Sequence, residues 1–153
     1  MIISGLRAIS AFIFSFMLLG SAVSFAQSCY PPGTLRWNGL PLTCGGATTC
    51  ITPNLDNLGR AAPGGTIYLR SDLNNYGSTF SIFLFSHECA HYQGIMNETQ
   101  ADAFAVCLGK RQGWLNEFGL RQVCAVTLPS RGSWTHLPGP ARCAAMIRAY
   151  RSC

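Results

Sequence analysis

Beyond the N-terminus, hydrophobic residues are most concentrated in a stretch that begins at Phe80 and continues at helical spacing as far as Gln93. Ser78 or Thr79 is a suitable N-cap for this stretch, and Gly94 is typical of a helix end. The pattern therefore predicts a helix from Phe80 to Gln93. Because this helix is apolar on nearly every face, we expect it to run through the centre of the domain.

Weaker helical patterns follow. Apolar residues recur at helical spacing after Glu98, between a capping Asn97 or Thr99 and a terminating Gly113, which predicts a second helix from Glu98 to about Gln112. The rest of the chain predicts a third helix interrupted at a glycine, a loop, and a last helix: Trp114 to Val126 with the break at Gly119, Pro129 to Pro140, and Ala141 to Arg151.

One strand is expected before the central helix. Thr66 to Arg70 alternates in the manner of a strand and is bounded by Gly64 and Gly65 on one side and by a polar segment on the other. At a sheet edge it would pair with an extended peptide, and an ordinary core strand fits the pattern equally well. Residues 27–65 are rich in Pro, Gly, Thr and Asn, so we expect loops with at most short strands there.

The N-terminal residues 1–26 have the pattern of a secretory signal peptide. Arg7 precedes a long apolar stretch, and Ser24 and Ala26 are small residues at a suitable cleavage site. We therefore expect an exported protein, periplasmic or extracellular, without stable membrane insertion after cleavage. An uncleaved anchor is the alternative, because the apolar stretch is near the shortest membrane span.

The chain has eight cysteines, all after residue 26, and an even number in a short exported chain predicts disulfides. Cys89 lies on the back of the central helix, so we expect it to be oxidised, with Cys107 or Cys124 as candidate partners. Residues 27–153 are long enough for one domain only. The predicted fold is α+β and mostly helical, with a small sheet and disulfide staples.

Charge argues against a nucleic-acid partner. Removal of Arg7 with the signal peptide lowers the formal net charge from +5 to +4, and the remaining arginines form no basic block. Arg142, Arg148 and Arg151 share the last predicted helix without interleaved aromatic residues, which indicates a solvated helix face.

The central helix carries the sequence H-E-C-A-H at residues 87–91, which has the form H-E-x-x-H. Residues four apart lie on one face of a helix, so His87 and His91 can bind one metal while Glu88 reaches a water on that metal. The chain has only six acidic residues, yet Glu98 and Asp102 also lie close to this motif. The alternative is a buried helix whose histidines are satisfied by hydrogen bonds.

Three segments carry a family resemblance: H-E-C-A-H at 87–91, E-T-Q-A-D at 98–102, and W-T-H-L-P-G-P-A-R at 134–142. The second is similar to an E-x-x-A-D motif, and the third has the spacing of a late H-P-x-x-x-x-R motif. With them the chain resembles the gluzincin-type zinc metallopeptidases, especially the family of the CAAX prenyl proteases and the bacterial heat-shock and periplasmic zinc proteases. The resemblance implies a zincin-like core.

The resemblance also implies residue roles. His87, His91 and Glu98 would hold Zn²⁺ and leave its fourth position for water, and Glu88 would accept the proton of that water. Asp102 would hydrogen-bond the free ring nitrogen of a ligand histidine.

His136 would donate a hydrogen bond to the oxyanion of the reaction, although a surface histidine fits equally well, and Arg142 would be structural or assisting. Glu98 follows His91 by only seven residues, whereas the family usually has a longer segment there, and the proline of the late motif is replaced by Leu137. A metzincin-like alternative would use Asn97 as the third ligand, but asparagine is a poor zinc ligand.

These observations predict an exported zinc metalloendopeptidase that hydrolyses polypeptide substrates. The alternative is a catalytically inactive, disulfide-rich binding module on a metallopeptidase scaffold. The intact Glu88 argues against this alternative, because a pure binder has no need of a general base.

Overall fold

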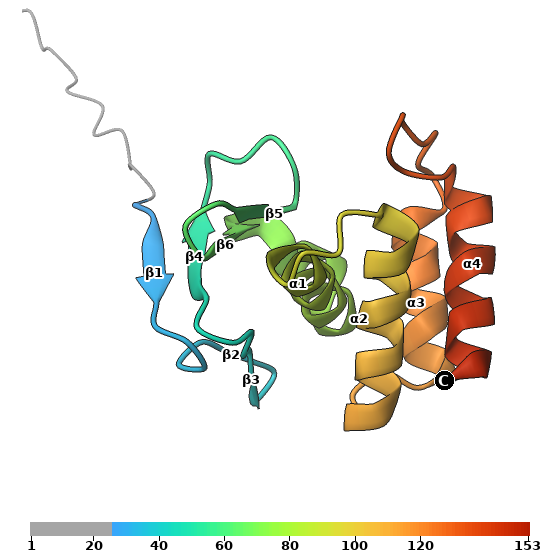
Figure 1. Cartoon of the computed structure of the whole chain (residues 1–153), viewed down its shortest axis with the longest axis horizontal. Coiled ribbons are helices and arrows are strands. Elements are labelled where there is room, and N and C mark those ends of the chain that lie inside the picture. Colours follow the sequence, from blue (N-terminus) through green and yellow to red (C-terminus); the bar gives the residue numbers. More distant parts are fainter. Residues whose placement is uncertain (1–25) are drawn as a thin grey trace, which may run out of the picture.

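The computed structural model describes residues 26–153, and the predicted signal peptide at residues 1–26 lies outside this part of the chain except for its last residue. The fold is α+β, about half helical, with a small mixed sheet on one side of a central helix and three helices on the other (Figure 1). None of the helices in the described part is long and apolar enough to cross a membrane.

The sheet has four short strands in the order β1-β4-β6-β5. Strand β6 (Thr66–Arg70) is the predicted strand; it pairs parallel with β4 (Thr48–Thr52) and antiparallel with β5 (Gly59–Ala62). Strand β1 (Ser28–Tyr30) completes the sheet beside β4. The segment after residue 27 thus contains short strands, as expected, and the two edges of the sheet are β1 and β5, because β6 is internal.

Two further short strands, β2 (Arg36–Trp37) and β3 (Leu40–Pro41), form a separate hairpin. A 3-10 helix, η1 (Ser71–Tyr76), then connects β6 to the first α-helix.

Helix α1 (Ser78–Tyr92) is the centre of the domain, as its apolar pattern predicts. All of its residues from Phe80 to Ala90 are buried, between β5 and β6 on one side and the other helices on the other side. The helix begins two residues earlier than predicted and has no side-chain cap. Gly77 adopts a φ of 86° at its N-terminus, and Ser81 Oγ donates to the Gly77 carbonyl at 3.0 Å.

Helix α2 (Glu98–Gln112) has the predicted boundaries, because Asn97 Oδ1 accepts from the Gln100 N–H at 3.0 Å and Gly113 ends the helix with a φ of 77°. Helix α3 (Glu117–Thr127) begins after a cap at Asn116. The predicted break at Gly119 is wrong: Gly119 is helical and buried, and its missing Cβ leaves room for the Thr79 methyl group.

Helix α4 (Gly139–Ser152) packs against α2 and α3 at the far side from the sheet (Figure 1). The prediction of a solvated arginine face is wrong for Arg142, which is half-buried and bound to Asp102 of α2. The hydrophobic core is formed by residues of the sheet, η1 and all four α-helices: Ile67, Leu69, Leu73, Phe83, Val106, Leu115, Val123 and Met146.

All eight cysteines form disulfides, as predicted. The β1–β4 disulfide joins Cys29 to Cys50, and the α1 disulfide joins Cys89 to Cys44 in the loop before β4. Cys89 is therefore oxidised, but its partner is neither Cys107 nor Cys124.

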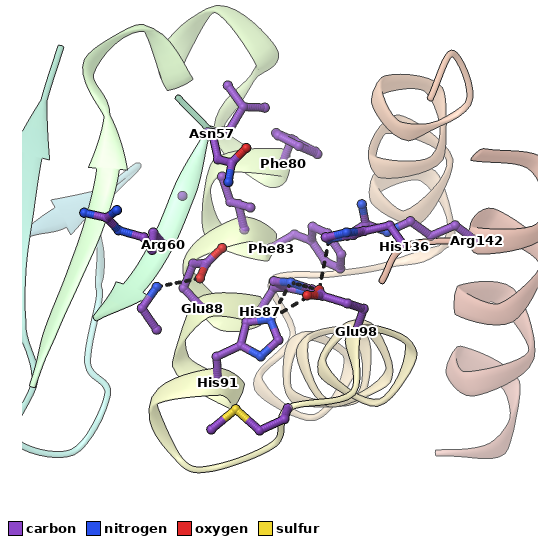
Figure 2. A pocket seen from close by; sticks show the side chains of 15 residues that line it. Asn57, Arg60, Phe80, Phe83, His87, Glu88, His91, Glu98, His136 and Arg142 are labelled. Atoms are coloured by element: carbon purple, nitrogen blue, oxygen red, sulfur yellow. Dashed lines mark hydrogen bonds and ion pairs between the residues drawn. The ribbon is translucent and has the colours of Figure 1, made fainter. Parts of the chain in front are cut away.

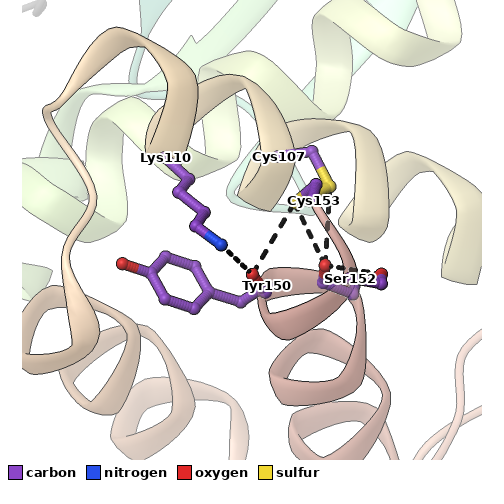
Figure 3. Close-up of a disulfide and its surroundings, with 6 residues drawn as sticks. Cys107, Lys110, Tyr150, Ser152 and Cys153 are labelled. Carbon is purple, nitrogen blue, oxygen red and sulfur yellow. Dashed lines mark hydrogen bonds between the residues drawn. A yellow bond between two sulfur atoms is a disulfide. The ribbon is translucent and has the colours of Figure 1, made fainter.

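The other two disulfides hold α4. The α3–α4 disulfide joins Cys124 to Cys143, and the α2–α4 disulfide joins Cys107 to Cys153 at the C-terminus. Beside the latter, Lys110 Nζ donates to the Tyr150 carbonyl at 2.8 Å (Figure 3). Four disulfides are typical of an oxidising, exported environment.

Candidate metal centre

The turn between α1 and α2 brings the predicted ligands together. Gly94, with a φ of 93°, donates its N–H to the His91 carbonyl at 2.9 Å, and the Ile95 N–H reaches the Ala90 carbonyl at 3.0 Å. This pair of bonds is a Schellman motif, which needs the positive φ that glycine tolerates. The chain then reverses within a few residues, and Glu98 enters the first turn of α2 directly opposite the two histidines (Figure 2).

The same turn fixes the tautomer of His91. Its Nδ1 lies 2.7 Å from the carbonyl oxygen of Ile95. A carbonyl can only accept, so Nδ1 carries the proton and Nε2 of the neutral ring presents a lone pair.

His87 has the same tautomer for a different reason. Its Nδ1 lies 2.9 Å from Oδ1 of Asp102, which is 2 % exposed and bound by Arg142 at 2.6 and 2.7 Å. Burial opposes ionisation of Asp102, but the hydrogen bonds from Arg142 and His87 outweigh it and lower the pKa of Asp102. The ionised carboxylate accepts from Nδ1–H, so in the neutral ring Nε2 of His87 also carries the lone pair.

These lone pairs and one carboxylate oxygen converge. His87 Nε2 and His91 Nε2 are 3.0 Å apart, and Glu98 Oε2 lies 3.1 Å from the first and 3.3 Å from the second. Ligand atoms bound tetrahedrally at about 2.0–2.1 Å are separated by about 3.4 Å. The spacing of the three atoms therefore fits a zinc-sized cation held by His87, His91 and Glu98.

A positive charge among these three groups stabilises the arrangement, because the Nε2 lone pairs of His87 and His91 and the Glu98 carboxylate repel one another. A proton is one such charge. Burial of His87 opposes its protonation, but the hydrogen bonds to Asp102 and Glu98 outweigh that cost and raise the pKa of His87 to about 9. For Glu98, burial is likewise outweighed by the hydrogen bond with His87, so the pKa of Glu98 is lowered.

His136 approaches the same carboxylate from the loop between α3 and α4. Its Nε2 lies 3.0 Å from Glu98 Oε2, and one ligand atom each of His87, Glu98 and His136 lie within 4.8 Å of one another. This second candidate ligand set shares His87 and Glu98 with the first and has His136 in place of His91. Unlike the other two rings, His136 has hydroxyl groups at Nδ1, so its tautomer is not fixed by a pure acceptor.

Glu88 points away from this cluster toward the sheet edge (Figure 2). Its side chain is buried, and Oε2 accepts from the Ala61 N–H of β5 at 2.8 Å. Gly59 makes this approach possible, because a Cβ there would lie 3.0 Å from Glu88 Cγ and Oε1. Burial is the main cause of the raised pKa of Glu88, which the charges of His87 and His91 reduce only in part.

All these groups line one cleft of about 450 Å³ between β5 and the helices. Its walls are β5 on one side and α1, α2 and the His136 loop on the other, with apolar residues from the first turns of α1, Phe80, Phe83 and Leu84, at one end. The sequence did not indicate β5 as a wall of the cleft, and Asn97, the rival third ligand, instead caps α2.

No family model, curated protein or solved structure matches this chain.

Proposed function

We propose that this chain is an exported zinc metallopeptidase with a zincin-like core, and that His87, His91 and Glu98 hold the metal. The observation that carries the proposal is the enforced tautomers of His87 and His91. Each Nδ1 faces a pure acceptor, so in the neutral rings both Nε2 atoms carry lone pairs, 3.1 and 3.3 Å from Glu98 Oε2. Hydrogen-bonded core histidines do not require this convergence.

A zinc ion in this position supplies a Lewis acid that polarises a carbonyl and lowers the pKa of a bound water. Glu88 is the general base in this proposal. Its bond to the Ala61 N–H holds one carboxylate oxygen at β5 and leaves the other oxygen to accept a proton. Burial raises the pKa of Glu88, which suits a base that must also give the proton up.

The polypeptide substrate would bind along β5. The Leu58 carbonyl accepts from the Arg70 N–H of β6, so by alternation Gly59 and Ala61 direct their main-chain groups away from β6 into the cleft. Glu88 occupies the Ala61 N–H, which leaves the Ala61 carbonyl and the Gly59 groups for a peptide. An extended peptide can pair with such an edge by main-chain hydrogen bonds. The sequence suggested β6 for this role, and the proposal assigns it to β5.

The metal half of the proposal is tested by metal analysis of the purified chain after signal cleavage. We expect stoichiometric zinc in the wild type, loss of zinc in His87→Ala and in Glu98→Ala, and retention in Glu88→Gln. Zinc absent from the wild type after supplementation would refute the proposal.

The catalytic half is tested by cleavage of a labelled, unfolded polypeptide. Glu88→Gln removes the base but none of the three ligands, so turnover should fall about 10²- to 10⁴-fold at unchanged zinc content. If a zinc-loaded wild type and this variant show the same negligible turnover, the binding-module alternative is favoured.

A further inference from the structure

Backbone hydrogen bonds hold the loop that carries His136 in a defined conformation. The Gly139 N–H donates to the Ser130 carbonyl at 2.8 Å, and the Ser133 N–H donates to the His136 carbonyl at 2.9 Å. Gly132 adopts a φ of 81°, and a Cβ there would lie 2.7 Å from the Pro138 nitrogen. The backbone therefore presents the His136 ring to Glu98 in one orientation.

The Ser133 hydroxyl acts as a hydrogen-bond donor because both of its lone pairs already accept hydrogen bonds. Its Oγ accepts from the N–H groups of Thr135 at 3.3 Å and His136 at 3.1 Å, which occupy both lone pairs of the hydroxyl. Its own proton must therefore go to a further partner. Two acceptors are in reach, Thr135 Oγ1 at 3.2 Å and His136 Nδ1 at 3.4 Å.

Thr135 continues the chain of hydrogen bonds. Its Oγ1 lies 3.0 Å from His136 Nδ1, which is the shorter of the two contacts to that nitrogen. If Thr135 Oγ1 accepts from Ser133, its own proton is directed at His136 Nδ1. The Thr135 hydroxyl then donates to the ring, and Nδ1 is an acceptor.

The other side of the ring agrees with this direction. His136 Nε2 lies 3.0 Å from Glu98 Oε2, a good distance for an N–H that donates to a carboxylate. His136 thus has the opposite tautomer to His87 and His91, whose Nδ1 atoms face pure acceptors.

We propose that Ser133 and Thr135 are positioning residues that hold His136 in its Nε2–H tautomer, so that His136 faces the cleft as a hydrogen-bond donor and not as a third imidazole ligand. The consequence rests on the proposed function: an N–H beside the metal ligands can stabilise the charge that develops on a substrate carbonyl oxygen. The tautomer itself does not depend on that function.

The test is a long-range ¹⁵N–¹H correlation spectrum of the full mature chain at a pH where His136 is neutral, which identifies the protonated ring nitrogen. We expect predominantly Nε2–H in the wild type, with a small proportion of Nδ1–H, both with and without added zinc. In Thr135→Val and Ser133→Ala the proportion of Nδ1–H should rise about fivefold, the effect of losing one net hydrogen bond. Thr135→Ser should restore the wild-type spectrum.

Ser130→Ala is the matched control, because the Ser130 hydroxyl accepts from Gly132 in the same loop without touching the ring. A wild-type spectrum with predominantly Nδ1–H on His136, or with a zinc-bound Nε2, would overturn the inference. So would a Thr135→Val spectrum identical to the wild type. Failure of the proposed function looks different: zinc is then not taken up while the tautomer of His136 is as inferred.

Discussion

Arg142 connects the last helix to the metal centre, and its replacement by methionine should affect both stability and metal binding. Its two hydrogen bonds to Asp102 are 2.6 and 2.7 Å long, and Asp102 is 2 % exposed. Arg142→Met keeps an unbranched apolar side chain but leaves a buried carboxylate without its cation. Breaking a buried pair in this way costs about 3–5 kcal/mol, or roughly 10–25 °C in Tm for a domain of this size.

The effect on zinc follows from the orientation of His87. Asp102 holds the His87 Nδ1–H at 2.9 Å, and Arg142 fixes both oxygens of that carboxylate. Loss of a group that orients a ligand typically weakens metal affinity about 10- to 100-fold. Arg142→Lys keeps the positive charge but loses the bidentate contact with Asp102. Its zinc affinity should therefore lie between those of the wild type and Arg142→Met.

Chelator competition measures the affinity, and thermal unfolding measures the stability. Arg148→Met on the same helix is the control, because Arg148 makes no ion pair with any residue of the described part. If Arg142→Met retains zinc as tightly as Arg148→Met does, Asp102 does not need Arg142 to orient His87, and the reasoning fails.

The pH dependence of stability gives a second check on the same variant. Burial raises the pKa of Asp102, but Arg142 and His87 outweigh it and lower the pKa below the ordinary value of 3.8. The stabilisation by this ionised carboxylate is therefore fully present above that value and is lost as the pH falls through the lower, folded-state pKa. The stability difference between wild type and Arg142→Met should shrink in that acid range and remain constant near neutrality.

Two further variants probe the cleft and its support. Gly59→Ala places a Cβ 3.0 Å from the Glu88 side chain, so turnover should fall by up to about 100-fold at unchanged zinc content. The control is Gly46→Ala, whose Cβ would have no atom within 4 Å, and it should change neither the turnover nor the zinc content. Serines in place of the α3–α4 disulfide should cost about 3 kcal/mol and also weaken zinc binding, because this bond lies next to Arg142. The β1–β4 disulfide closes a loop of similar length, 21 residues against 19, so its loss should cost similar stability and leave zinc binding unchanged.

The sequence predicts the helices of this protein well where local chemistry defines their ends. Asn97 and Gly113 bound α2 because a side-chain oxygen caps its first turn and a positive φ ends its last. The break expected at Gly119 does not occur. That glycine instead lets α3 pack closely on Thr79, a contact between distant segments that propensity does not register.

The parts that the sequence does not predict depend on tertiary contacts. Strand β5 has the sequence Gly59–Ala62 without a β-branched or aromatic residue, and it is a strand because β6 pairs with it. Arg142 has the pattern of a solvated residue until Asp102 is placed opposite it. Disulfide partners are likewise set by the packing of helices on the sheet, which is why Cys44 was not expected for Cys89.

The three histidines of the cleft differ in the hydrogen-bond partners of their Nδ1 atoms. His87 and His91 face a carboxylate and a carbonyl, so each offers a lone pair in front. His136 Nδ1 faces the hydroxyls of Ser133 and Thr135, and in the tautomer that we propose its Nε2 offers an N–H. The H-E-x-x-H spacing predicts two candidate ligands, and the partners at Nδ1 add a criterion that the spacing lacks. On that criterion we propose His87, His91 and Glu98 as the metal ligands and His136 as a donor to the substrate.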